Sequence, residues 1–153
     1  MEVAVQLPLD PDGYLRRECP QCEREFKWHH GPTEGAPEPE EPPSVYFCPY
    51  CGEPAGLDQW YTKDQIETIR AAAMAEVLPK LRNDLKEALY PLNRSGFIKA
   101  DVKSRQPAQP PPLIEAADMV AVVSPCHPYE PVKIADSWDE AIHCLVCGSR
   151  YTV

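Results

Sequence analysis

The residues of this chain best suited to chemistry are its seven cysteines, and all of them fall in short clusters. Two pairs have the CxxC spacing, Cys19 with Cys22 and Cys48 with Cys51, and 25 residues separate the pairs. A tight turn at each pair lets two sulfur atoms converge, and two such turns supply four thiolates in the tetrahedral arrangement that Zn²⁺ prefers. The four residues therefore predict one closed zinc site, rather than buried free thiols or two disulfides.

The remaining three cysteines predict a second zinc site with an incomplete ligand set. Cys144 and Cys147 form another CxxC pair, but Cys126 stands alone. His127 is our first choice for the fourth ligand, because it is adjacent to Cys126 and flanked by prolines that bend the chain. His143 is the second choice, because neighbouring side chains of a strand point to opposite faces and it directly precedes Cys144. A water molecule could also fill the fourth position, or the cluster could hold no metal at all.

An open fourth position would permit a zinc-bound water and hydrolysis. Glu130 is the only acid close to Cys126 in sequence that could act as a base. The HExxH motif of zinc peptidases and the deaminase pattern are both absent from the sequence. We therefore expect no catalytic residues and no enzymatic activity.

Residues 1–60 are predicted to form the first module around the Cys19–Cys51 site. Residues 14–28 indicate a strand, a turn at the cysteines and a second strand, and Val45–Cys48 indicates a strand leading into the second turn. Residues 31–43 contain prolines and glutamates but no large apolar side chain. Such a segment buries little surface, so we expect a disordered or extended loop.

Residues 61–92 are predicted to be dominated by a long amphipathic helix at 63–90. Thr62 and Gln65 have the spacing of a capping box at its start. Apolar residues recur every three or four positions along one face. They are Ile66, Ile69, Ala73, Val77, Leu81, Leu85 and Leu89. Pro79 should kink or split the helix, and Pro91 with Asn93–Gly96 should end it.

The rest of the chain is predicted to be a linker followed by a second module. Residues 93–117 contain a strand candidate at Phe97–Lys103 and a proline-rich stretch. Residues 118–153 form the module of the second zinc site. Its strand candidates are Asp118–Val123, Val132–Ile134, Ala141–Cys144 and Arg150–Val153.

Charge and hydropathy narrow the classes of function. The net charge of −9 argues against a surface dedicated to nucleic-acid phosphates. Only residues 61–105 have more basic than acidic side chains. No apolar run approaches the ~20 residues that span a bilayer, and the first residues do not resemble a signal peptide. We expect a cytoplasmic protein, where paired CxxC motifs are more often metal ligands than disulfides.

The cysteine motifs resemble those of the zinc-ribbon superfamily at Cys19–Cys22, at Cys48–Cys51 with Gly52, and at Cys144–Cys147 with Gly148. The resemblance covers residues 14–60 and 119–153. The chain departs from the pattern at 126–129, where Tyr129 occupies the position of a second cysteine. Zinc ribbons include nucleic-acid binders, protein-docking modules and structural modules, so the resemblance implies a fold and a cofactor but no single function.

These observations predict a small zinc-stabilised α+β protein with two zinc-ribbon modules connected by the amphipathic helix. Its expected function is that of a non-enzymatic adaptor or regulatory subunit that docks through the central helix and the ribbon surfaces, with helix 63–90 binding a protein partner or a second copy. The first alternative is a nucleic-acid-binding accessory protein that uses the basic region 80–105. The second alternative is a zinc hydrolase with an open site near the C-terminus.

Overall fold

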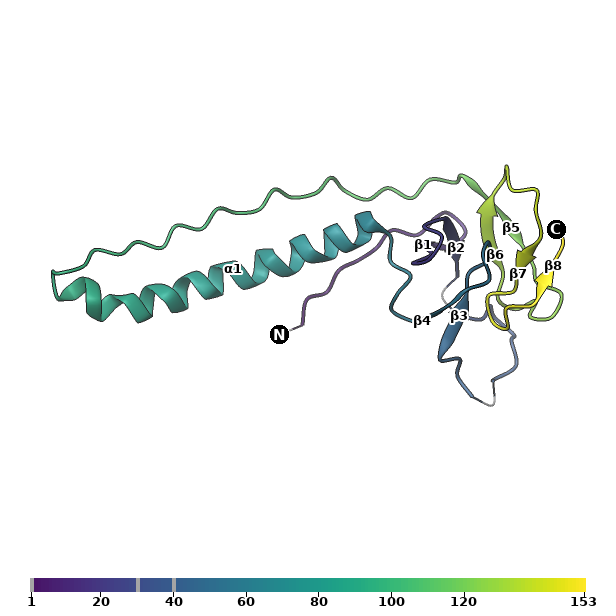
Figure 1. Ribbon diagram of the computed structural model, residues 1–153, viewed down its shortest axis with the longest axis horizontal. Helices are drawn as coiled ribbons and strands as arrows, with labels where there is room; N and C mark the ends of the chain where they lie inside the picture. The colour runs from purple at the N-terminus through teal and green to yellow at the C-terminus, as the bar shows by residue number, and fades with distance from the viewer. Residues whose placement is uncertain (1, 30, 40) are drawn as a thin grey trace. The chain divides into compact units, whose positions relative to one another are not determined.

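The computed structural model describes residues 2–29, 31–39 and 41–153, and within these residues it shows a small α+β fold. One helix and eight short strands follow one another in the described part of the chain (Figure 1). They are β1 (Leu15–Glu18), β2 (Glu25–Trp28), β3 (Val45–Phe47), β4 (Pro54–Gly56), α1 (Lys63–Arg94), β5 (Met119–Val122), β6 (Val132–Ala135), β7 (Ile142–His143) and β8 (Arg150–Tyr151). The chain forms two compact units, one of residues 7–63 with 113–153 and one of residues 1–6 with 64–112.

The two ends of the chain share one antiparallel sheet with the strand order β1-β2-β6-β5. Strand β2 pairs with β6, so that Lys27 lies opposite Lys133 and Trp28 lies opposite Val132. The two-stranded sheets β3-β4 and β7-β8 belong to the same compact unit. The sequence predicts two separate modules on either side of the helix, whereas the structure joins both cysteine-bearing ends through a common sheet.

One apolar core serves both cysteine clusters. Phe26, Trp60 and Ile142 are almost completely buried, and the rings of Phe26 and Trp60 meet edge to face with centroids 5.6 Å apart. Cys19 and Cys48 belong to the same core cluster. The small amount of apolar surface available to each end explains the merger, because a shared core buries more than two separate ones.

A network of buried charges binds two segments outside the sheet, around Asp10 and around Glu115, to strands β2 and β6. The ammonium group of Lys27, which is fully buried, contacts Glu115 at 3.0 Å and Asp10 at 3.5 Å and donates a hydrogen bond to the carbonyl of Ala116. Lys133 donates to Asp10 at 2.7 Å. Burial opposes the charged form of Asp10, but the hydrogen bond from Lys133 lowers the pKa of its carboxyl to about 2. Buried charges persist only when they are paired in this way.

Helix α1 begins directly after Thr62, as the capping box predicts, and runs without interruption to Arg94. The helix therefore ends at Arg94, within the predicted stretch Pro91–Gly96; of the kink or split predicted at Pro79, the split is wrong. The fixed φ of proline is compatible with a helix, and α1 continues through both prolines although each removes one hydrogen bond and crowds the carbonyl four residues earlier. Ala75, whose carbonyl loses its partner at Pro79, is exposed, so water is accessible there. The helix ends before Gly96, which has φ of +77°.

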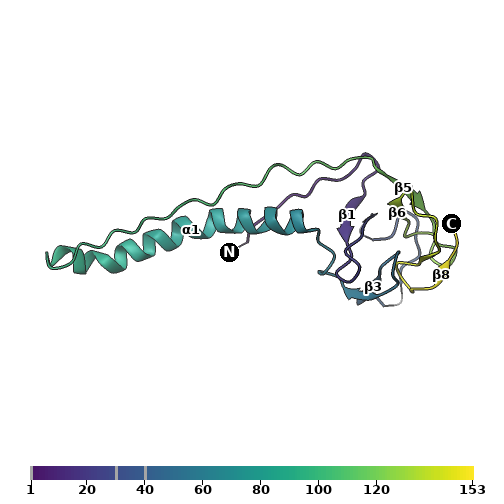
Figure 2. The same ribbon diagram turned by 45° about the horizontal axis from the view of Figure 1, so that its top comes forward.

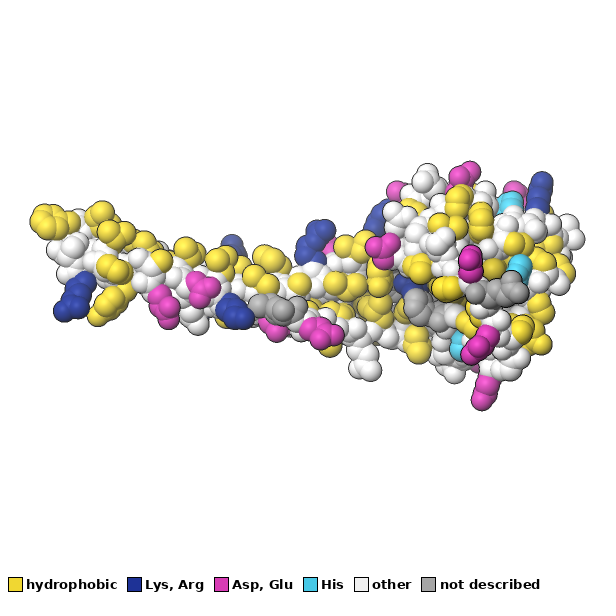
Figure 3. Space-filling view, turned by 90° about the horizontal axis from the view of Figure 1, so that it is seen from below, with side chains coloured by type: hydrophobic (Ala, Val, Ile, Leu, Met, Phe, Trp, Pro, Cys, Tyr) yellow, Lys and Arg dark blue, Asp and Glu magenta, His cyan; other side chains and the backbone are white. Residues whose placement is uncertain are grey.

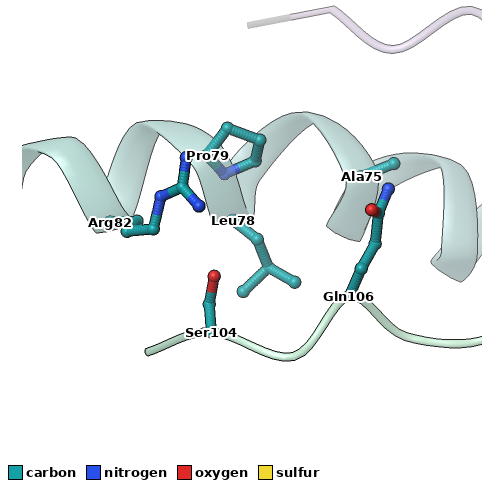
Figure 4. Close-up of a pocket in the computed structure, with 6 residues that line it drawn as sticks. All are labelled: Ala75, Leu78, Pro79, Arg82, Ser104 and Gln106. Atoms are coloured by element: carbon teal, nitrogen blue, oxygen red, sulfur yellow. The ribbon is translucent and has the colours of Figure 1, made fainter. Parts of the chain in front are cut away.

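The segment after the helix returns along it without forming a strand, so the strand predicted at Phe97–Lys103 is also wrong. Figures 1 and 2 show this segment running beside α1. The side-chain amide of Asn93 donates a hydrogen bond to the carbonyl of Ala100 at 2.9 Å and accepts one from its amide at 2.8 Å. These two hydrogen bonds satisfy backbone groups of Ala100 that a neighbouring strand would otherwise satisfy. A hollow of about 190 Å³ lies between the two, where Ser104 and Gln106 approach the helix near Pro79 (Figure 4). In the described part of the chain, no helix is long and apolar enough to cross a membrane.

Candidate metal centres

Three turns of the chain, at Cys19, Cys48 and Cys144, share one backbone hydrogen-bond pattern. In each turn, the carbonyl of the first cysteine accepts a hydrogen bond from the amide four residues later, at 2.8 to 3.0 Å. The amide of the same cysteine donates to the carbonyl five residues later, at 2.9 to 3.0 Å. We call these turns knuckle 1 (residues 19–24), knuckle 2 (48–53) and knuckle 3 (144–149). The shared pattern gives each CxxC pair the same tight geometry.

The fourth residue after the first cysteine lies in the left-handed region in all three knuckles. Gly52 and Gly148 have φ of +74° and +73° at this position, and Glu23 has φ of +56°. Glycine adopts this conformation without steric cost, whereas a residue with a Cβ is strained there. The zinc-ribbon resemblance includes Gly52 and Gly148 at this position, but Glu23 was not singled out from the sequence. Superposing the three CxxC motifs would have shown that Glu23 occupies the glycine position.

Knuckles 1 and 2 together form the first cluster, in which the sulfur atoms of Cys19, Cys22, Cys48 and Cys51 all lie within 4.8 Å of one another. The Sγ atoms of Cys19 and Cys51 are 3.7 Å apart, as are those of Cys22 and Cys48. Sulfurs about 2.3 Å from a tetrahedral zinc ion would be about 3.8 Å apart, whereas a disulfide would need about 2.05 Å. The spacing therefore fits a four-thiolate metal site and excludes disulfides in this structure.

The first cluster favours a bound cation on electrostatic grounds. Burial raises the pKa of the Cys48 thiol far above its ordinary value. Burial also opposes ionisation of Cys19, but hydrogen bonds from the amides of Cys22 and Gln21 lower the pKa of that thiol. Four thiolates cannot gather in a buried place without positive charge between them, and a coordinating metal ion removes the thiol protons.

Knuckle 3 contributes to the second cluster, in which the ligand atoms of Cys126, His127, Cys144 and Cys147 also lie within 4.8 Å of one another. The Sγ atoms of Cys126 and Cys147 are 3.4 Å apart, and Nδ1 of His127 lies 3.4 Å from Sγ of Cys144. The structure thus brings together the residues that the sequence analysis placed first. Four converging atoms from the protein are typical of closed structural zinc sites rather than of catalytic ones.

A buried serine positions the two adjacent ligands of the second cluster. Ser124 Oγ lies 3.0 Å from Cys126 Sγ and accepts a hydrogen bond from the amide of His127 at 3.4 Å. This serine turn replaces the missing knuckle and orients Cys126 and His127 toward the same point. The role of Ser124 was not predicted, although serine is common in turns.

His143, the second choice for the fourth ligand, contacts knuckle 2 of the first cluster and is not among the four converging residues of the second cluster. Its amide donates to the carbonyl of Pro49 at 2.8 Å, and its ring covers Gly52, where a Cβ would lie 2.8 Å from the ring. In the reciprocal contact, Phe47 donates to the carbonyl of Leu145 at 2.8 Å, and its ring covers Gly148 with the same 2.8 Å spacing. The residue before the first cysteine of knuckles 2 and 3 therefore covers the glycine of the other knuckle, which couples the two clusters.

The second cluster is nevertheless more accessible than the first. Cys126 and Cys147 are exposed, whereas Cys144 is buried. Burial opposes ionisation of Cys147, but hydrogen bonding with the hydroxyl and amide of Ser149 lowers the pKa of its thiol to about 6. A thiol of this kind releases its proton to a metal ion readily at neutral pH.

Comparisons of this chain with family models, with curated proteins and with solved structures give no match.

Proposed function

We propose that the chain is a zinc-binding interaction protein without enzymatic activity, an adaptor or a regulatory subunit of a protein complex. In this proposal, two Zn²⁺ ions hold the unit that contains both cysteine clusters, with zinc-ribbon-like knuckles as their frame. Zinc is the metal of choice because Cys₄ and Cys₃His sets with tetrahedral spacing are typical of structural zinc sites. Helix α1 is the proposed docking element.

The observation that carries the proposal is the exposed apolar face of α1. Among the described side chains of the helix, only that of Gln65 is buried. A row of large apolar residues is 40 to 50% exposed along one face. We call this row the apolar row; it consists of Ile66, Met74, Val77, Leu81, Leu85 and Leu92. Hydrophobic side chains recur along the helix in Figure 3.

The length of the apolar row supports docking rather than internal packing. A helix of 32 residues extends about 48 Å at 1.5 Å per residue. The segment that follows the helix reaches the apolar row only at Met74, where it forms a second hollow with Arg70 and Ala71, and Val77, Leu81, Leu85 and Leu92 do not line that hollow. An apolar face that a protein leaves exposed to water is typical of a helix that binds a partner or a second copy of itself.

The first alternative, nucleic-acid binding, has less support. The basic residues in the second half of α1 alternate with acids, for example Lys80 with Asp84 and Lys86 with Glu87. This pattern gives a solvated surface rather than a continuous basic stripe, and the whole chain carries a net charge of −9.

A variant of the apolar row and a matched control test the proposal. L81S/L85S should abolish self-association in light scattering, or abolish recovery of the proteins that co-purify from the native host. N83S/E87S alters the same turns of the helix outside the apolar row and should retain the association. Metal analysis should give two zinc ions per chain in both variants. Equal association of both variants, or a nucleic acid as the sole co-purifying component, would contradict the proposal.

A further inference from the structure

The turn that follows helix α1 exposes two consecutive large apolar side chains. Phe97 is 94% exposed and Ile98 is 54% exposed. Tyr90, about one helical turn before the end of α1, is 64% exposed. We call these three residues the apolar tip. None of them belongs to the apolar row, so the apolar tip is a second surface that the protein leaves in contact with water.

Hydrogen bonds close this turn and hold it in one arrangement. The side chain of Asn93 both donates to and accepts from the backbone of Ala100. The hydroxyl of Ser95 donates to the carbonyl of Leu92 at 2.7 Å, and Gly96 provides the left-handed φ of +77° that the turn requires. The two consecutive apolar residues of the tip lie between the ends that these bonds join. The turn therefore satisfies its own backbone groups while it presents apolar side chains outward.

The end of α1 is also basic, although the protein as a whole is acidic. Residues 88–100 include Arg94 and Lys99 but neither aspartate nor glutamate, whereas the whole chain has a net charge of −9. The nearest acids in the sequence are Glu87 and Asp101. Figure 3 shows hydrophobic side chains gathered at the end of the helix where the chain turns, with a basic side chain next to them. Apolar and positive groups are thus combined at one place.

The surface of an anionic lipid bilayer matches this combination of groups. Aromatic residues, arginine and lysine are typical of membrane–water interfaces, where apolar groups enter the upper acyl region and cations remain near the phosphates. Lipids are mobile and can surround a projecting turn without a preformed cavity. A nucleic-acid base could stack on the ring of Phe97 but would leave the branched side chain of Ile98 in water. A protein partner would need a pocket that is both apolar and acidic.

We propose that the apolar tip docks onto a bilayer that contains anionic lipids, with Phe97 and Ile98 inserted below the headgroups and Arg94 and Lys99 against the lipid phosphates. Apolar burial and the attraction of opposite charges then act together. Few residues take part, so the binding is peripheral and reversible. It does not depend on the protein docking proposed for the apolar row.

The test compares vesicles of phosphatidylcholine and phosphatidylserine in equal parts with vesicles of phosphatidylcholine alone. The zinc-loaded full chain should co-sediment with the mixed vesicles and bind the neutral ones at least about tenfold more weakly, because two cations contribute only at the anionic surface. F97S/I98S should weaken binding to the mixed vesicles at least about tenfold. R94Q/K99Q should bind both kinds of vesicle equally weakly. Because all four side chains are exposed, zinc content and helical circular dichroism should not change.

Two matched controls change residues outside the apolar tip. I114S/V123S removes apolar side chains that are 86% and 55% exposed, and K80Q/R82Q removes two exposed cations of α1. Both should bind the mixed vesicles as wild type does. F97W reports insertion directly, because brominated acyl chains should quench its added fluorescence while the fluorescence of wild type stays unchanged.

The proposal is overturned if wild type does not bind the mixed vesicles, or if F97S/I98S binds them equally well. An equal loss of binding in either control variant would also overturn it, because the attraction would then not come from the tip. Fluorescence of F97W that brominated lipids do not quench would exclude insertion. If F97S/I98S lost a co-purifying protein or nucleic acid while wild type ignored vesicles, the tip would belong to that partner instead.

Discussion

The two cysteine clusters gather four ligand atoms with the same compactness but in opposite surroundings. In the first cluster, Cys19 and Cys48 are fully buried members of the core. In the second cluster, Cys126 and Cys147 are exposed. In the proposed zinc-bound protein, the same arrangement of ligand atoms would therefore stabilise two different environments. A metal ion at the first cluster would stabilise the core itself. A metal ion at the second cluster would hold exposed residues against a core that is already formed.

The largest expected effect separates the clusters by serine substitution. C48S removes a ligand that no solvent reaches, so we expect the unit of residues 7–63 and 113–153 to lose its fold. Structural zinc contributes about 10 to 16 kcal/mol in small metal-dependent peptides, which exceeds the stability of most domains. C126S should release one zinc ion and leave the sheet β1-β2-β6-β5 folded. Near-UV circular dichroism with metal analysis measures both.

The comparison would fail if C48S kept its tertiary signal, or if C126S lost it. Either outcome would mean that the buried cluster is not the foundation of this unit. Chelation of wild type should reproduce the C48S result, which would show that the metal rather than the serine causes the loss.

The second prediction tests whether the clusters act independently. In G148A, the new Cβ would be strained at φ of +73° and would meet the Phe47 ring at 2.8 Å. Left-handed strain costs about 1 to 2 kcal/mol, and crowding costs a similar amount, so we expect a loss of about 2 to 4 kcal/mol. Because Phe47 precedes Cys48, the variant should also accelerate metal release from the first cluster. Denaturant unfolding and release rates measure the two effects.

G35A is the matched control, because Gly35 also has positive φ but no atom lies within 4 Å of its Cβ position. Strain without crowding should leave metal release from the first cluster unchanged. If G148A changed metal release from the second cluster alone, the contacts of Phe47 with Gly148 and of His143 with Gly52 would not couple the two clusters.

The third prediction concerns the order of metal loss. A chelator should remove zinc from the wild-type protein in two phases, with the exposed second cluster first. We expect a difference of at least about tenfold, or about 1.4 kcal/mol in the free energy of local opening. Absorbance of a metal-sensitive dye records the phases, and C126S should lack the fast one. Zinc release in a single phase would show that the two clusters lose metal equally fast. A C126S variant that lacks the slow phase would show that the second cluster, rather than the first, releases its zinc last.

The ligand sets were predictable because metal spacing is a local property of the sequence. The CxxC pairs fixed three knuckles, and the adjacency of Cys126 and His127 was sufficient to prefer His127, whose Nδ1 does lie at the cluster. The start of α1 was predictable for the same reason, since a capping box occupies four consecutive residues. The strands β5 to β8 lie within or close to their predicted ranges.

The features that depend on distant residues were not predictable. Pairing of β2 with β6 joins residues about a hundred positions apart, and the alternation of side chains in a strand does not indicate which edge it will meet. Pro91 alone predicts an end of the helix that is too early, because a proline weakens a helix through one lost hydrogen bond and a crowded carbonyl, and the residues after it decide whether the helix continues. The contact of His143 with Gly52 could not be predicted from the sequence, because it forms only when knuckles 2 and 3 pack against each other in the fold.

The smallest expected effect concerns the one knuckle that lacks glycine. Glu23 adopts φ of +56°, where glycine has no steric cost, and its carboxylate contacts the exposed Lys63 ammonium at 3.2 Å. E23G should stabilise the unit by about 0.5 to 1 kcal/mol, because the relief of left-handed strain exceeds the contribution of an exposed ion pair, typically about 0 to 1 kcal/mol. E23A removes the ion pair but keeps a Cβ, so it should not stabilise. Since knuckle 1 belongs to the buried cluster, E23G should slow only the slower phase of metal release, and a change in the faster phase would show that strain at Glu23 reaches the second cluster.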